Sequence, residues 1–252
     1  MGTGPTPRAH QPSFRGFALS NGRYTNFDVP GATTKTVVGG SNDRGQLVGF
    51  YTQTGVLDDP NSPRRGYLLD HGRLVRIDFP DAVDTQTLGI NNRGQVAGQY
   101  VDAAGGLHGF VWERGRYTTV DAPGAVGTFV TDINDRGQLL GGRGEPDGTV
   151  RGFVLERGRS TTFAPPGAVF VAPFDINNRG QIVGSAYRDP AATAGRGFLL
   201  AKGPSGAFAP VNFPGAANTV VAGINDRGLI VGAYQAAALV SDLRSARPSA
   251  AL

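Results

Sequence analysis

The chain has 252 residues, and its 39 Gly and 17 Pro residues give it nearly double the usual share of these turn-forming types. The absence of Cys excludes disulfides, thiolate metal sites and cysteine nucleophiles, while 39% hydrophobic residues suffice for a core. The net charge of +4 comes mostly from arginines that recur at fixed places in a repeat, which is typical of a solvated rim and disfavours nucleic-acid binding. No apolar run is long enough to span a bilayer, and no secretory signal is predicted in residues 1–13.

Three landmarks recur five times in the same order: a Gly-Phe or Gly-Tyr pair, a Pro-Gly-Ala or Pro-Asp-Ala turn, and an Asn-x-Arg-Gly segment followed by apolar residues. The asparagines of the last landmark are Asn42, Asn91, Asn134, Asn177 and Asn225. Their period of about 43 residues is typical of propeller blades or helical solenoids. The apolar runs are short and end in Gly, Asn or Pro, which indicates β-strands rather than helices.

In chain order, the sequence opens in the middle of a unit, with two strands between Arg15 and Pro30. Complete units of four antiparallel strands follow. In the third unit, strand A is 128–134, strand B is 138–142 and strand C is 152–155, and strand D runs to the next Pro-Gly-Ala turn. The chain then leaves in the middle of a unit, with an A strand and a B strand over 219–234.

The two half-units predict how the fold closes. If the last A and B strands pair with the first C and D strands, the ring has five complete blades and no open sheet edge. We therefore predict an all-β, five-bladed β-propeller over residues 14–234, with an N-terminal arm (1–13) and a C-terminal tail (235–252) that is either a short helix or flexible. A closed ring has no edge through which to dimerise, so we expect a monomer.

The motif Arg/His-Gly-Phe, followed by Pro-Gly-Ala and then Gly-Ile-Asn-x-Arg-Gly-Gln-Val-Val-Gly, resembles the HAF repeat of bacterial extracellular repeat proteins. The resemblance covers residues 14–234. The His-Ala of the family triplet reads Arg-Gly in four units and His-Gly at His108. The resemblance implies a propeller-like fold and a secreted or surface location, and it brings no catalytic residues.

In a propeller, the loops from strand D to strand A and from strand B to strand C share the face at the channel mouth, where ligands commonly bind. This face is predicted to carry Arg15, Arg65, His108, Arg151 and Arg196 at the starts of C strands, and Tyr51, Tyr100, Arg143 and Tyr234 at the ends of B strands. Guanidinium groups beside phenols suit an anionic or hydroxylated ligand. In the alternative interpretation, each arginine pairs with a loop carboxylate, for which the candidates are Asp58, Asp59, Asp102, Glu145, Asp147 and Asp189.

The first residues of the A strands differ most between units, and they are Lys35, Asp84, Gly127, Phe170 and Asn218. For Lys35 and Asp84 we expect a salt bridge, with a catalytic pair as the alternative. Asp132 and Asp175 replace the glycines of the other units, so we expect a structural role, with a shared proton or cation as the alternative.

Other recurring residues are assigned to the fold. The aromatic residues of strand C are predicted to pack between blades, and they are Phe17, Tyr67, Phe110, Phe153 and Phe198. Trp112 aligns with leucines of the other units and is expected in packing. Asp28, Asp78 and Asp121 are predicted to cap turns, a series that Ala164 and Asn212 interrupt.

The sequence carries no zinc-protease, serine-hydrolase, P-loop or EF-hand signature, so no metal and no cofactor is predicted. The favoured function is a non-catalytic propeller module that binds a saccharide, an anionic small molecule or a protein at the channel-mouth face, with no membrane partner. The alternative is a lyase, cyclase or glycoside-cleaving enzyme with its site at the same mouth. A scaffold without a ligand is a third interpretation.

Overall fold

The structure is a computed structural model that describes residues 14–20, 22–30, 32, 35–52, 62–189, 191 and 194–236. Every regular element in these ranges is a β-strand, which confirms the all-β prediction. No helix in the described part is long and apolar enough to cross a membrane. The predicted arm (1–13), most of the predicted tail, and the loop residues Asp58 and Asp59 lie outside the described residues.

Four complete blades each join four consecutive strands in an antiparallel meander, as predicted. The first contains β3 (Thr36–Ser41), β4 (Leu47–Thr52), β5 (Arg64–Asp70) and β6 (Arg73–Ile77). The second contains β7 (Asp84–Ile90), β8 (Val96–Val101), β9 (Leu107–Glu113) and β10 (Arg116–Val120). The third contains β11 (Gly127–Ile133), β12 (Leu139–Gly144), β13 (Val150–Glu156) and β14 (Arg159–Phe163), and the fourth contains β15 (Phe170–Ile176), β16 (Ile182–Tyr187), β17 (Arg196–Leu200) and β18 (Phe208–Pro210).

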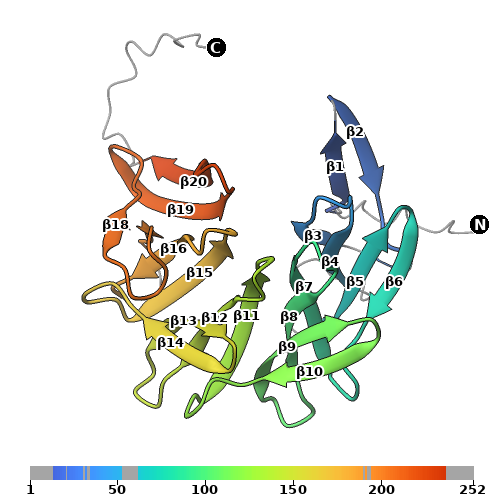
Figure 1. The fold of residues 1–252 in the computed structure, drawn as a ribbon, viewed down its shortest axis with the longest axis horizontal. Coiled ribbons are helices and arrows are strands. Elements are labelled where there is room, and N and C mark those ends of the chain that lie inside the picture. The colour runs from blue at the N-terminus through green and yellow to red at the C-terminus, as the bar shows by residue number, and fades with distance from the viewer. Residues whose placement is uncertain are drawn as a thin grey trace, which may run out of the picture.

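Two further hairpins lie at the ends of the chain. β1 (Gly16–Ser20) pairs with β2 (Arg23–Phe27), and β19 (Ala216–Ile224) pairs with β20 (Ile230–Ala236). The complete blades form an arc that carries one hairpin at each end (Figure 1). The described strands include no pairing between β1 and β20, so the ring is open in this structure.

The Asn-x-Arg-Gly hairpins hold neighbouring blades together at the inner end of each first strand. In one example, Asn134 Oδ1 accepts hydrogen bonds from the backbone N–H groups of Arg136 and Gln138, at 3.0 and 3.1 Å. Its Nδ2 donates to Gln138 Oε1 and, across the blade boundary, to the backbone oxygen of Asn177 at 3.0 Å. The asparagine therefore satisfies its own turn, as expected, and also links its blade to the next one.

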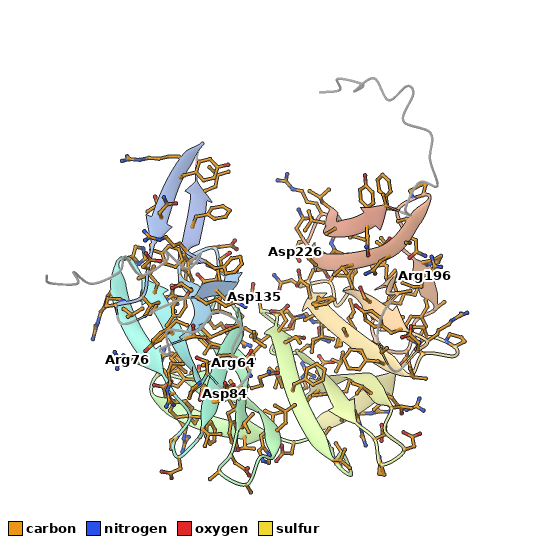
Figure 2. The ribbon with its side chains drawn as sticks, turned by 180° about the vertical axis from the view of Figure 1, so that it is seen from behind. Arg64, Arg76, Asp84, Asp135, Arg196 and Asp226 are labelled. Atoms are coloured by element: carbon orange, nitrogen blue, oxygen red, sulfur yellow. The ribbon has the colours of Figure 1, made fainter. Side chains whose placement is uncertain are left out.

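The residue after each of these asparagines adds a second chain of contacts between blades. Carboxylates and amides alternate along it, in the order Asp43, Asn92, Asp135, Asn178 and Asp226. Asn92 Nδ2, for example, donates to both flanking carboxylates, at 2.7 Å to Asp43 and 2.9 Å to Asp135. These hairpins line a cavity of about 640 Å³ on the inner side of the arc, where Asp135 and Asp226 lie (Figure 2).

The core consists of clusters between successive blades. The strand-C aromatic is buried in every complete blade, and the exposed fractions are 0% for Tyr67 and Phe110, 1% for Phe153 and 3% for Phe198. The sequence predicts the same burial for Phe17, but 58% of it is exposed, because its hairpin β1–β2 lacks the inner half of a blade. Trp112 packs against the cluster around Phe110, as expected.

Candidate functional site

The predicted channel-mouth residues lie at one end of the blades, which we call the loop face, where strand B passes to strand C and strand D to the next strand A. There the last residues of strand B stand directly opposite the first residues of strand C. The opposed pairs are Tyr51 and Arg65, Tyr100 and His108, Arg143 and Arg151, and Ala186 and Arg196. The structure therefore groups these side chains blade by blade.

In the β3–β6 blade, Tyr51 fills its position completely. It is fully buried beside Val29, and burial raises the pKa of its phenol, an effect that the charges of Arg76 and Arg65 oppose. Burial also raises the pKa of Asp78, against the same two guanidinium groups. This blade end is a packed cluster in which the charges of Arg65 and Arg76 offset the charge of Asp78.

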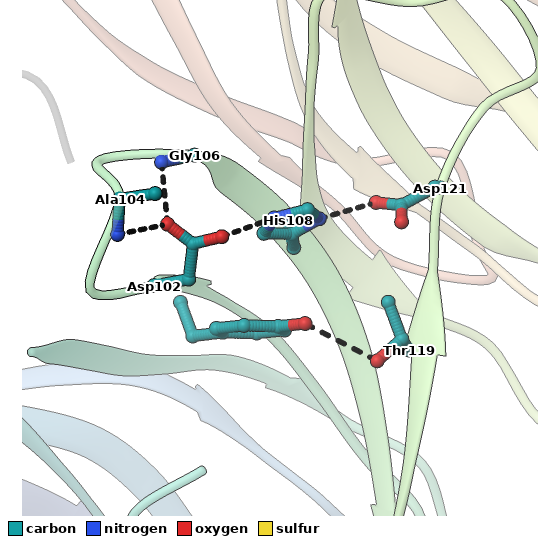
Figure 3. Close-up of polar contacts among 7 residues, drawn as sticks. Asp102, Ala104, Gly106, His108, Thr119 and Asp121 are labelled. Atoms are coloured by element: carbon teal, nitrogen blue, oxygen red, sulfur yellow. Dashed lines mark hydrogen bonds and ion pairs between the residues drawn. The ribbon is translucent and has the colours of Figure 1, made fainter. Parts of the chain in front are cut away.

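In the β7–β10 blade, the same position holds a stack of rings. Phe79, from the preceding loop, lies parallel to Tyr100 with centroids 3.7 Å apart, and Tyr100 stacks on His108 at 5.0 Å. The Tyr100 hydroxyl is hydrogen-bonded to Thr119 at 3.2 Å (Figure 3). The blade's own aromatic side chains thus fill this end.

Two carboxylates flank His108 in that stack. Its Nδ1 lies 2.9 Å from Asp121 and its Nε2 lies 3.3 Å from Asp102 (Figure 3). Asp102 is oriented by hydrogen bonds from the backbone N–H groups of Ala104 and Gly106. Partial burial lowers the pKa of His108, but the two carboxylates outweigh it, so the pKa is raised overall. The two carboxylates therefore neutralise the basic residue. Asp102 was expected to pair with an arginine, and Asp121 was expected to cap a turn.

The β11–β14 blade shows the same neutralisation with arginines. Arg143 Nη2 donates a hydrogen bond to one oxygen of Glu145 at 3.2 Å, and its Nε lies 3.0 Å from the other oxygen. Arg151 Nε lies 3.8 Å from the same carboxylate. One carboxylate thus lies between two guanidinium groups.

The β15–β18 blade differs from these three, because Ala186 stands where Tyr100 stands and Pro165 where Phe79 stands. The vacated space is a pocket of about 500 Å³. Phe198, Phe208 and the prolines give it apolar walls, and its polar lining residues are Arg188, Asp189, Arg196 and Asn212. Asn212 Oδ1 accepts a hydrogen bond from Gly197 N–H at 3.1 Å.

The end hairpins carry the remaining predicted rim residues. Arg15 pairs with Asp28 at 3.3 Å, and both side chains are exposed. Tyr234 stacks on Phe213 with centroids 3.7 Å apart, in the same arrangement as Tyr100 on Phe79, yet 52% of Tyr234 is exposed.

The predicted residues at the starts of the A strands have separate surroundings. Asp84 is buried, and its Oδ2 accepts from Arg64 Nε at 2.7 Å and from Arg64 N–H at 3.0 Å (Figure 2). Lys35 lies over the ring of Phe14. Phe170 contacts Tyr187 edge to face, and Asn218 Oδ1 accepts from Gly195 N–H. The ion-pair partner of Asp84 is therefore Arg64, where we expected Lys35.

Asp132 and Asp175 lie on the neighbouring inner strands β11 and β15. Asp132 also accepts from Ile176 N–H at 3.0 Å, and Asp175 accepts from Ile224 N–H at 2.7 Å. Burial, reinforced by the neighbouring carboxyl of Asp175, raises the pKa of Asp132 well above its ordinary value. Each carboxyl therefore holds the backbone of the next inner strand, which is the structural role that we expected.

The pocket residues that the sequence did not predict as site residues include Pro165, Ala186, Arg188 and Phe208. Ala186 had a visible signal, because it is the only small residue among the five aligned strand-B ends. The sequence marks Asn212 only as a break in the capping series. Within the described ranges, no group of three or more His, Asp or Glu side chains is placed to hold a metal ion.

No family model matches the chain, and no curated protein sequence matches it. Similar solved structures include a triple arginine-to-alanine mutant of AofleA from Arthrobotrys oligospora, with 14% identity, a TM-score of 0.47, and coverage of 84% of this chain and 70% of that one. A mutant Aleuria aurantia lectin in complex with Fucα1-6GlcNAc has 12% identity, a TM-score of 0.47, and coverage of 87% of this chain and 79% of that one. The same lectin with α-methyl-L-fucoside has 12% identity, a TM-score of 0.46, and coverage of 84% and 76%. At these values the likeness establishes no ligand for this chain.

Proposed function

We propose that the chain is a non-catalytic β-propeller module that binds a saccharide or a small anionic molecule on its loop face. The observation that carries this proposal is the pocket of the β15–β18 blade. Three other strand-B ends hold an aromatic ring and one holds an arginine paired with Glu145, whereas Ala186 leaves its place open. A concave site with apolar walls and a few polar groups is the common form of a small-molecule site.

Binding is favoured over the enzyme alternative by the surroundings of Asp84. Its carboxylate accepts hydrogen bonds from the backbone and side chain of Arg64 and from Gln86 Nε2. Such a saturated carboxylate positions the start of its strand and has little capacity left for proton transfer.

The proposal includes a single domain over residues 14–234 that closes into five blades. In complete blades, a strand-B glycine lies opposite the strand-C aromatic, and an added Cβ would meet the ring, as at Gly98 with Phe110 (3.0 Å) and Gly184 with Phe198 (2.9 Å). Gly232 on β20 has no ring over it, and Phe17 on β1 has no glycine beneath it. The β19–β20 hairpin thus has the glycine without its ring, and the β1–β2 hairpin has the ring without its glycine.

We propose that β1 docks in a groove on the β19–β20 hairpin. It has a volume of about 280 Å³ and is lined by Val221, Val231 and Gly232 among others. By the register of the complete blades, Gly232 would face Phe17 and Val231 would face Ala18. Burying Phe17 there removes its exposed ring from water, and closure removes both free strand edges. Membership of the HAF-repeat family stays a prediction.

Closure is tested with the double variant Ala18→Cys and Val231→Cys, in a chain that has no other cysteine. In the proposed register these positions are directly opposed, so mild oxidation gives an intramolecular disulfide in the monomer. The control pairs Ala18→Cys with Ala233→Cys, which lies two residues further along β20 and out of direct opposition. Absence of the first disulfide, or equal formation in the control, overturns the proposed register.

Ligand binding is tested by screening saccharides and small anions for an increase in the thermal midpoint of the chain, since a ligand of the folded state stabilises it. The Ala186→Tyr variant places the ring of the β7–β10 blade in the pocket and is expected to abolish the increase. Tyr100→Phe, in the other blade, serves as the control and retains it. A midpoint increase that survives Ala186→Tyr excludes this pocket as the site.

A further inference from the structure

The structure points to a carboxylate-bearing saccharide, such as one with a uronic-acid residue, as the ligand of the β15–β18 pocket, with Arg188 and Arg196 as its anion-binding pair. This inference rests on the binding function proposed above. It concerns the charge and the shape of the pocket, each of which can be compared with the same place in another blade.

In the β7–β10 blade, the basic residue His108 is flanked by the carboxylates of Asp102 and Asp121. In the β15–β18 blade the corresponding basic residue is Arg196, and the corresponding positions of the two carboxylates hold Arg188 and Asn212. Both carboxylates are therefore replaced, one of them by a second guanidinium. Asp189 is the one acidic residue among the pocket's lining residues, so the two guanidinium groups outnumber the carboxylates there.

The β11–β14 blade shows that a carboxylate can lie between two arginines at this end of a blade. There Glu145 lies between Arg143 and Arg151, at 3.0 and 3.8 Å from their Nε atoms. Arginine binds carboxylates through two parallel hydrogen bonds. In the β15–β18 blade Arg188 stands at the position of Glu145, so we propose a carboxylate of the ligand as the counter-ion of Arg188 and Arg196.

The pocket also has the shape of the ring stack that fills the β7–β10 blade. Phe79 and Tyr100 occupy there the space that Pro165 and Ala186 leave open. The pocket of about 500 Å³ keeps Phe198, which is buried, and the ring of Phe208 as walls. A six-membered sugar ring is similar in size to the missing rings, and its apolar C–H face packs against aromatic side chains.

The same pocket also offers hydrogen-bond partners for the hydroxyl groups of a saccharide. Asn212 uses its Oδ1 for Gly197 N–H, which leaves its Nδ2 as a donor. Asp189 is a second hydrogen-bonding side chain in the lining of the pocket. This combination favours a hydroxylated acid over a purely aromatic one.

The experiment is calorimetric titration of the full chain with digalacturonate, with the neutral disaccharide lactose and with acetate. We expect digalacturonate to bind at least tenfold more tightly than lactose, and acetate to bind more weakly than both, because charge-assisted hydrogen bonds and ring packing each contribute. Arg196→Gln and Arg188→Gln are each expected to weaken digalacturonate binding about tenfold. Arg179→Gln, on the opposite hairpin of the same blade, is the matched control and leaves it unchanged.

The outcomes separate this inference from the function on which it rests. Equal binding of lactose and digalacturonate, abolished by Ala186→Tyr but unaffected by either arginine variant, overturns the carboxylate inference and leaves the binding function standing. Acetate that binds as tightly as digalacturonate overturns the saccharide part. Binding of no saccharide or anion by a folded chain overturns both proposals.

Discussion

The β7–β10 and β15–β18 blades share one strand order and one register, yet their loop ends differ. In the first, Phe79, Tyr100 and His108 form a stack and two carboxylates neutralise the histidine. In the second, Pro165 and Ala186 leave a pocket that Arg188 and Arg196 help to line. The difference shows that a repeat protein can keep the same strands in two copies while its own side chains fill the loop end of one copy and leave a pocket in the other.

The largest effect is expected from opening the filled blade. Tyr100→Ala removes a buried ring from the stack, and such deletions leave a cavity, so the free energy of unfolding should fall by about 3 kcal/mol. Tyr100→Phe keeps the ring and loses only the contact with Thr119, so its cost should stay below about 1 kcal/mol. Denaturant unfolding measures both, and equal costs would show that ring packing does not stabilise this end.

The same two blades also differ on their inner strands, where Gly89 corresponds to Asp175. Because the pKa of Asp132 beside Asp175 is raised, the folded state holds the proton more tightly than the unfolded state does. That contribution to stability is complete below the ordinary pKa of 3.8 and is lost as pH rises through the raised pKa. Asp132→Asn should therefore gain stability relative to the parent chain on going from pH 4 to pH 8.

Denaturant unfolding of the parent chain and of Asp132→Asn at both pH values checks this. A difference between the two proteins that is the same at pH 4 and pH 8 would contradict the raised pKa of Asp132.

A smaller gain is expected from filling the open blade. Ala186→Tyr restores the ring found in the β7–β10 blade and buries part of it against Phe198 and Phe208, which should add about 1 kcal/mol to the free energy of unfolding. The measurement is denaturant unfolding without ligand. A loss of stability would mean that the pocket cannot accept a ring of this size.

The smallest effect concerns the charges around His108. Its raised pKa means that the imidazolium contributes stability below the ordinary value of 6.5, and that this is lost as pH rises through the raised pKa. Since the group is partly exposed, Asp121→Asn should cost less than about 1 kcal/mol at pH 5 and still less at pH 8. Titration of His108 by NMR is expected to give a lower pKa in the variant, and an unchanged pKa would remove Asp121 from the account.

The strand pattern could be predicted because it recurs five times in the sequence. Each copy has Gly and Asn at turns that only a few residue types can form. Gly137, for example, has φ of 76°, and Asn134 caps the same turn. The site was harder to predict because the pocket forms where large side chains are missing. Sequence motifs point to residues such as Arg196 that carry chemistry, whereas the pocket arises from Ala186 and Pro165, which carry none. Pair partners such as Arg64 for Asp84 depend on how side chains reach across strands, which spacing alone does not give.

The most direct measurement is hydrogen exchange of the full chain with and without digalacturonate. The two compared blades offer matched backbone amides, Gly197 beside the pocket and Gly109 beside the ring stack. The account predicts slower exchange at Gly197 and at the neighbouring ends of β16 and β17, with no change at Gly109. Protection at Gly109 instead, or protection spread equally over all blades, would contradict the assignment of the site to the β15–β18 blade.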